Sequence, residues 1–531
     1  MQSNHASYRR LSVLCTGTVL LLIMGGCGTQ ASKVKSQAAA SVTMDASPQS
    51  DAAGEATAQF NTEAYDSITE NEFVKTLVSP QSTFSIDVDT ASYSNVRRFL
   101  TEGQLPPKGA VRIEELVNYF SYNYPEPDGE HPFSVSTEIA ACPWETDHRL
   151  VRIGLKGKTS KPSERLASNL VFLLDVSGSM MQDNKLPLVK KAMKLLVNEM
   201  DERDRIAIVV YAGASGVALP STSAAQSRQI ESAIDDLSAG GSTNGGAGIQ
   251  LAYQIAETNR IAKGINRVIL CTDGDFNVGT TSKSELIDLI TEKAKSDTFL
   301  TVLGFGDGNL KDSTMEKLAD KGNGNYAYID NLLEARKVLV EQTGSTLQTI
   351  AKDVKIQVDF NPRHVHSYRL IGYENRLLAN QDFRDDIKDA GEIGAGHTVT
   401  AFYEIAPSDA RNELVDTRPS EFVTTSLNRQ ADADTMLSVN LRYKQPTAPE
   451  SSEFQERLPA TSESVSGSQD FRFATAVVAY GMLLRDSRFR GDASWDWVIS
   501  TAENSLGDDR NGLRREFLQL AKSARRISQQ D

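Results

Sequence analysis

Continuous apolar runs alternate with amphipathic stretches in the middle of the chain. The apolar runs span residues 170–174, 206–211, 268–272 and 299–305, and amphipathic stretches such as 186–197 and 286–294 lie between them. Apolar strands separated by helices are typical of a parallel, doubly wound sheet with both faces covered. We therefore predict an α/β domain over residues 166–347, in which ligands would bind beyond the carboxyl ends of the strands.

Alternating apolar and polar positions flank this domain on both sides. They occur at 133–137 and 150–155 before it, and at 354–360, 367–373, 397–405 and 436–443 after it. Such alternation is typical of half-exposed strands. We predict one β-sandwich, built from residues 131–165 and 348–445, into which the α/β domain is inserted.

The rest of the chain has weaker patterns. Helix-spaced apolar positions at 96–100 and 113–120 follow a short alternating strand, which predicts a small α+β unit over 71–130. Residues 446–467 are rich in Pro, Ser and Glu and are interpreted as a linker. Residues 468–531 have helical periodicity and predict a C-terminal helical domain.

The first 27 residues have the pattern of an export signal. Two arginines precede the apolar run 11–24, which ends in Gly-Gly-Cys27 and is too short to span a membrane. This ending resembles the lipoprotein signal box, which implies that Cys27 becomes the lipidated (palmitate-type) first residue of the mature protein. The alternative is an ordinary secretory signal with an incidental cysteine. Residues 28–70 are rich in Ala, Ser, Gln and Thr and predict a flexible tether.

The signal also predicts where the protein resides. Gly28, rather than Asp, follows Cys27, and the lipoprotein resemblance then implies sorting to the outer membrane. We expect a lipid-anchored protein of the bacterial cell envelope, facing the periplasm or the cell surface.

Composition narrows the choice of partners. The 531 residues carry 56 basic and 70 acidic side chains, a formal net charge of −14. That charge would repel a phosphate backbone, so no nucleic-acid partner is predicted. With the signal removed and Cys27 lipidated, only Cys142 and Cys271 remain. Whether they pair is left open, although Cys271 lies in an apolar run where a buried thiol is expected.

Polar motifs adjoin three elements of the α/β domain, at the sheet edge that would bring them together. Asp175, Ser177 and Ser179 alternate directly after the first apolar run. Thr243 lies in a Gly-Gly-Ser-Thr-Asn segment, and Asp273 directly follows the third apolar run. Carboxylate and hydroxyl oxygens are the ligands that hard cations such as Mg²⁺ prefer. The sequence therefore predicts a divalent metal site at this edge.

These motifs resemble, in order and residue type, the metal-ion-dependent adhesion site of the von Willebrand factor A domain. The resemblance implies Ser177, Ser179 and Thr243 as hydroxyl ligands, with Asp175 and Asp273 holding the metal largely through its waters. It implies Mg²⁺ (or Mn²⁺ or Ca²⁺) as cofactor and a protein partner whose exposed Asp or Glu completes the shell. The alternative is that Asp175 and Ser177 merely cap the following helix.

The whole chain resembles bacterial von Willebrand A lipoproteins of the YfbK type. The segment 84–93 with 112–115 is similar to the N-terminal domain of that family, and 473–484 with Ser494-Trp495 to its C-terminal helical domain. The implied function is metal-dependent protein binding in the envelope, for adhesion, scaffolding or assembly, without catalysis. The alternatives are an envelope hydrolase that docks through the A domain, and a purely structural lipoprotein.

One pair of acidic residues resembles a catalytic motif. Asp87 and Asp89 match the paired carboxylates of aspartyl phosphatases, which follow a strand. That chemistry needs a large α/β core after the motif, and a small unit with Pro106-Pro107 follows instead. We expect these acids to have turn or cap roles.

Overall fold

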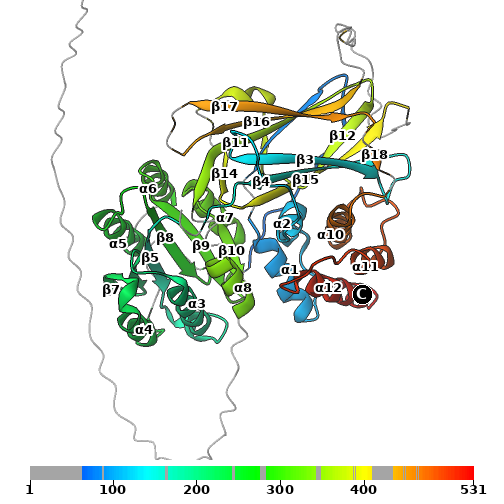
Figure 1. Ribbon diagram of the computed structural model, residues 1–531. Helices are drawn as coiled ribbons and strands as arrows, with labels where there is room; N and C mark the ends of the chain where they lie inside the picture. The colour runs from blue at the N-terminus through cyan, green and yellow to red at the C-terminus, as the bar shows by residue number, and fades with distance from the viewer. Residues whose placement is uncertain are drawn as a thin grey trace, which may run out of the picture. The chain divides into compact units, whose positions relative to one another are not determined.

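Three β-sheets organise the part of the chain that the structure describes (Figure 1). The computed structural model describes residues 63–86, 89–161, 165–241, 245–274, 283–341, 348–386, 388, 390–409, 428, 434–446, 448, 450–461, 463–464 and 466–530. These residues belong to one unit, Gln59–Asp531. No helix in the described ranges is long and apolar enough to cross a membrane. The predicted signal, with Cys27, lies outside them.

The sheet of the α/β domain has the strand order β10-β9-β8-β5-β6-β7. Its strands are β5 (Ser168–Asp175), β6 (Arg205–Tyr211), β7 (Ser215–Ser223), β8 (Ile265–Thr272), β9 (Phe299–Phe305) and β10 (Tyr326–Ile329). Neighbouring strands are parallel except β6 and β7, which are antiparallel. The predicted α/β domain is confirmed, and each of its four apolar runs forms a strand. The edge strand β7 was not predicted, because its polar, half-exposed residues form no apolar run.

Helices cover both faces of this sheet (Figure 1). One face packs against α3 (Leu186–Glu199), α4 (Ser227–Asp235) and α8 (Leu332–Arg336), and the other against α5 (Gly245–Thr258), α6 (Lys283–Lys295) and α7 (Asp312–Lys321). Short helical turns in the described ranges are η1 (Lys108–Ala110), η3 (Gly178–Met181), η4 (Ala224–Gln226), η5 (Lys337–Glu341, a π turn) and η6 (Asn380–Arg384). Both faces are therefore buried, as the unbroken apolar strands require.

The other two sheets face each other and share one core. One has the order β1 (Val74–Lys75), β12 (Val365–Ile371), β15 (Thr398–Pro407), β4 (Arg149–Gly157), β3 (Phe133–Ala141) and β18 (Glu463–Ser464). The second has the order β13 (Leu377–Leu378), β2 (Gln81–Ser85), β11 (Thr349–Phe360), β16 (Thr435–Lys444) and β17 (Ser451–Pro459), with β14 (Gly391–Gly394) on β11. Side chains such as Ile153, Val358 and Tyr403 fill the space between them. Six of these strands lie where alternation predicted a strand.

The predicted linker at 446–467 is wrong. Residues 451–459 of it form β17, which pairs antiparallel with β16 and lies at the edge of its sheet. Leu458 and Phe454 oppose Leu437 and Leu441 and pack against the sandwich core. The other residues of this edge strand are mostly exposed to solvent and polar, so the segment was mistaken for a linker.

The predicted N-terminal unit is not separate from the rest. Its strand β1 belongs to one sandwich sheet and its strand β2 to the other. Its helices α1 (Ala91–Thr101) and α2 (Ile113–Asn118) share one core with α10 (Gln469–Arg485), α11 (Trp495–Glu503) and α12 (Leu513–Ser528). Phe120 touches Phe473 and Phe517 edge-on, with ring centroids 5.0 and 5.7 Å apart. The C-terminal helices are as predicted, but they complete a core that begins at Tyr93, in α1.

The end of the predicted tether is also wrong, because residues 63–70 pack on the structured part. The Glu63 side chain is 4% exposed and pairs with Arg98 at 2.9 Å. Tyr65 packs against the apolar cluster beneath α5, α6 and α7. The small polar residues that precede Glu63 and Tyr65 in the sequence did not indicate that these two side chains make such contacts.

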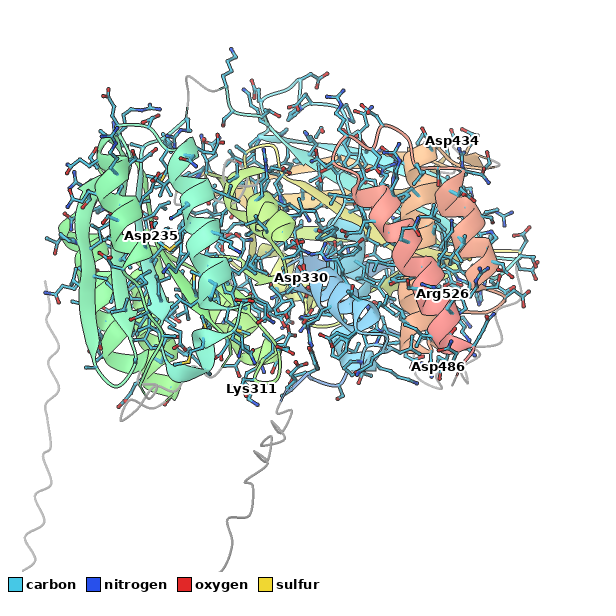
Figure 2. All side chains as sticks on the ribbon, turned by 90° about the horizontal axis from the view of Figure 1, so that it is seen from below. Asp235, Lys311, Asp330, Asp434, Asp486 and Arg526 are labelled. Carbon is cyan, nitrogen blue, oxygen red and sulfur yellow. The ribbon has the colours of Figure 1, made fainter. Side chains whose placement is uncertain are left out.

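Arg97 on α1 connects three parts of the structure. Its guanidinium pairs with Asp330 (2.5 Å) and Glu334 (2.6 Å) of the α/β domain and with Glu516 (2.9 Å) of α12. Figure 2 labels Asp330 where the ribbon of the α/β domain meets that of α1. Since Arg97 and Glu334 are both buried, loss of Arg97 would remove this ion pair from the buried Glu334 carboxylate, while loss of Glu334 would leave Arg97 with Asp330 and Glu516.

Candidate metal site

Strand β5 ends at Asp175, and a tight turn follows at the edge of the sheet. The Ser177 backbone N–H donates to Asp175 Oδ1 at 2.8 Å. The hydroxyl oxygens of Ser177 and Ser179 lie 3.1 Å apart. Ser177 precedes the turn η3, but its side chain makes no capping hydrogen bond. The structure thus brings the three predicted residues together and does not support the interpretation of Ser177 as a helix cap.

The Asp175 carboxylate is enclosed by the domain. Its side chain is fully buried, and its Oδ2 atom accepts no hydrogen bond of normal geometry from the described residues. Burial raises the pKa of Asp175 to about 6, and the charge of Asp273 adds to the rise, while Ser177 and the nearby Tyr211 hydroxyl oppose it. Burying a carboxylate is costly unless hydrogen bonds or a cation compensate for the lost water, so a cation beside Asp175 would stabilise its charged form.

Asp273 reaches the same edge from the neighbouring strand. β8 pairs in parallel with β5, with Leu174 opposite Cys271, so the two strands end side by side. Gly274 follows with φ of +101°, and a Cβ there would lie 2.7 Å from the Asn309 carbonyl oxygen. The glycine in the Thr-Asp-Gly motif is therefore required by the backbone conformation that carries Asp273 past the sheet edge.

Lys185 is a residue of this site that sequence reasoning missed. Its Nζ donates to Asp273 Oδ2 at 2.9 Å, and both side chains are buried. Gly306 makes room for its methylene stem, since a Cβ on Gly306 would lie 2.2 Å from Lys185 Cε. One signal was available: a lysine directly before a helix is disfavoured by the helix dipole, which indicates an acidic partner.

Thr243 lies outside the described residues, but the residues just before it are hydrogen-bonded to the Asp175 loop. The Gly178 N–H donates to the Gly241 carbonyl at 3.1 Å, and the Gly240 N–H donates to the Val176 carbonyl at 2.7 Å. The segment before Thr243 is therefore bound to the loop that carries Asp175, and α5 begins at Gly245.

The described donors fit a hard divalent cation. Neighbouring ligands of an octahedral ion with bonds of ~2.1 Å are ~3.0 Å apart, and the hydroxyl oxygens of Ser177 and Ser179 lie 3.1 Å apart. The buried Asp175 carboxylate supplies negative charge beside them. Within the described residues no group of three or more His, Cys, Asp or Glu side chains could hold a metal. A site built from hydroxyls and two carboxylates is compatible with that finding.

The other candidate residues have structural roles. Asp87 lies outside the described residues, while Asp89 accepts a hydrogen bond from the Tyr326 N–H at 2.7 Å and lies 3.5 Å from Arg376. Asp89 therefore has a structural role, as a buried contact between elements. Cys142 and Cys271 are both free and buried, and burial raises the pKa of each thiol. The buried Cys271 thiol is as expected.

Comparisons with protein families cover nearly all of the described chain. Residues 169–342 match the von Willebrand factor type A domain, and residues 345–527 match the family described as "Uncharacterized protein YfbK, C-terminal". Residues 59–152 match a further model described as "von Willebrand factor". A solved structure titled "von Willebrand factor type A from Catenulispora acidiphila" has 16% identity over 75% of this chain and 91% of its own, with a TM-score of 0.41.

Two relatives extend the comparison. "Uncharacterized protein sll0103" of Synechocystis is 30% identical over 192 residues, 36% of this chain and 44% of its own length. "Uncharacterized protein YfbK" of Escherichia coli is 42% identical over 470 residues, 87% of this chain and 81% of the relative. With both the A domain and the C-terminal region matched, the chain belongs to the YfbK family of von Willebrand factor A domain proteins.

Proposed function

We propose that the chain is a metal-dependent protein-binding module that catalyses no reaction. Von Willebrand A domains commonly bind a divalent metal and mediate protein–protein interactions, and this chain contains one. Asp175, Ser177, Ser179, Thr243 and Asp273 would hold Mg²⁺ or a similar cation, and the cation would attract a carboxylate of the partner. The observation that carries this proposal is the fully buried Asp175 carboxylate at the end of β5, beside two hydroxyls at a ligand-to-ligand spacing.

The charges at the site favour an acidic partner. Asp175 and Asp273 contribute −2 and the buried Lys185 contributes +1, so the protein supplies −1 in total. With a divalent cation the site carries +1, which attracts an Asp or Glu side chain in surroundings of low dielectric constant. Met181, two residues beyond Ser179, is 64% exposed and offers an apolar contact beside the metal.

Titration with the metal alone tests the proposal. We expect calorimetry to detect one Mn²⁺ or Mg²⁺ site in the chain from residue 28 onward, and the Asp175→Asn variant to bind at least about tenfold more weakly. Asp235→Asn, which alters a surface carboxylate on α4 that pairs with Lys194, is the control and should bind as the unmodified protein does. Equal metal affinity in Asp175→Asn and the unmodified protein would contradict the proposal.

We also propose that the protein is anchored in the bacterial cell envelope through a lipid on Cys27. The apolar run before Gly-Gly-Cys27 supports this anchor. Metabolic labelling with palmitate should mark the unmodified protein and not a Cys27→Ser variant. Equal labelling of both would rule out Cys27 as the anchor.

A further inference from the structure

A cavity of about 270 Å³ lies between the α/β domain and the sandwich, at the opposite end of β8 from Asp273. From the α/β domain it is lined by Arg267 of β8 and by residues between α7 and β10. From the sandwich it is lined by residues around β13, β14 and the start of β11. It is therefore separate from the metal site in both position and residues.

Arg267 is an unusual cation in this cavity. Its side chain is only 1% exposed. Nη1 donates to the Thr301 hydroxyl at 2.6 Å, and the guanidinium lies over the Phe299 ring at 5.6 Å. Its buried Nε has no hydrogen-bond partner among the described residues. Taking a guanidinium out of water without a paired anion is costly.

The other cations that line the cavity already have carboxylates. Arg376 pairs with Asp320 at 2.8 Å and with Glu316 at 3.1 Å. The two lysines, Lys321 and Lys388, also lie within 4 Å of an aspartate. Among the described lining residues, Arg267 is thus the cation for which no ion pair is formed.

The opposite wall supplies an acceptor and a neutral donor. Glu392 also lines the cavity. Burial lowers the pKa of the Arg267 guanidinium to about 10, and the negative charge of Glu392 opposes this change. The Glu392 carboxylate accepts long hydrogen bonds from Asn323 (3.4 Å) and Thr349 (3.3 Å). Burial lowers the pKa of His397 to about 4, so its imidazole is neutral at pH 7 and retains one N–H to donate.

We propose that this cavity binds a protonated oxyanion, namely hydrogen phosphate or the singly protonated form of a phosphomonoester. Arg267 would bind the anionic oxygens through its free donors, since guanidinium groups suit phosphate geometry. The ligand P–O–H would donate to Glu392. Sulfate has no proton at neutral pH, so its oxygens would face the Glu392 carboxylate without a hydrogen bond and be repelled.

Phosphate titration in metal-free buffer at constant ionic strength tests the assignment. We expect calorimetry to show one phosphate site with sulfate bound roughly tenfold or more weakly, by the energy of one missing hydrogen bond to a charged group. Arg267→Met should lose the phosphate site. Arg510→Met, at a side chain that is 84% exposed, should keep it. Binding of phosphoserine as well as phosphate would assign the monoester, and binding of phosphate alone would assign the free ion.

Two further measurements keep the test decisive if Arg267→Met is difficult to interpret. In phosphate-free buffer Arg267→Met should melt at or above the temperature of the unmodified protein, because it removes a buried cation without an ion pair. Glu392→Gln should remove the discrimination against sulfate. The proposal would be overturned if phosphate at about 10 mM did not bind, because the binding free energy would then be less than ~3 kcal/mol. Equal phosphate binding by Arg267→Met, or unchanged selectivity in Glu392→Gln, would also overturn it.

Discussion

At the scale of single residues, the candidate metal site consists of polar side chains at the ends of β5 and β8 and of one lysine, Lys185, directly before α3. Asp175, Ser177, Ser179 and Asp273 could be assigned because each follows a recognisable apolar strand, and parallel strands end at one edge. Lys185 belongs to no motif. Its pairing with Asp273 depends on the path of its side chain over Gly306, which only the tertiary structure reveals.

Lys185 should weaken metal binding while it stabilises the metal-free protein. In Lys185→Met the cation beside Asp273 is lost, and we expect Mn²⁺ affinity to rise about tenfold, because like charges no longer repel. The metal-free variant should lose about 3 kcal/mol of unfolding free energy, since the buried Asp273 carboxylate loses its ion pair with Lys185. Calorimetry and urea unfolding in EDTA measure the two effects.

Lys191→Met is the matched control for that experiment, because Lys191 is exposed on α3, the helix that Lys185 directly precedes. It should change neither quantity. Excess Mg²⁺ should also narrow the stability gap between Lys185→Met and the unmodified protein, since a ligand that binds the folded state stabilises it. A Lys185→Met variant with weaker metal binding would show that the ammonium supports the metal rather than competing with it.

At the scale of elements, alternation and apolar runs predicted the strands in which each face is clearly buried or clearly exposed. Strand β9 lies at the predicted residues 299–305, because both of its faces are buried. The edge strands β7 and β17 were missed, since one half of each is in solvent and the apolar pattern is diluted. At the end of the α/β domain, α8 is followed by the π turn η5 up to Glu341, and residues 342–347 lie outside the described ranges.

Helix α2 carries a carboxylate that should make stability depend on pH. Burial, followed by the charges of Glu374 and Glu115, raises the pKa of Glu114 to about 8. The folded state then keeps this proton between pH 4.5 and 8 while the unfolded chain releases it, so stability falls as pH rises through that window. From pH 5.5 to 7.5 the loss from Glu114 should be about 2 kcal/mol.

The Glu114→Gln variant, which mimics the protonated acid, isolates this effect. Urea unfolding at several pH values should give a profile shallower than that of the unmodified protein by the Glu114 contribution. Glu202→Gln, at an exposed carboxyl in a turn, should leave the profile unchanged. Parallel profiles for Glu114→Gln and the unmodified protein would mean that Glu114 is already ionised in the folded state.

At the scale of the whole molecule, sequence order was a poor guide to which parts share a core. The apolar faces of α1, α2 and α10 were visible in the sequence, but periodicity identifies a buried face without identifying its partner. The structure joins these faces in one cluster, and the buried Arg97 pairs across it with the α/β domain. The A domain is therefore held by elements from both ends of the described chain.

The central claim is that the Asp175 loop holds a divalent metal, and its position can be measured directly. Crystals of the chain from residue 28 onward, grown with Mn²⁺, should give an anomalous difference peak beside the Ser177 and Ser179 hydroxyls, at ligand distances of about 2.1–2.3 Å. The same peak should be absent from Asp175→Asn crystals. Saturating Mn²⁺ with no peak at this loop, or a peak unaffected by Asp175→Asn, would contradict the account.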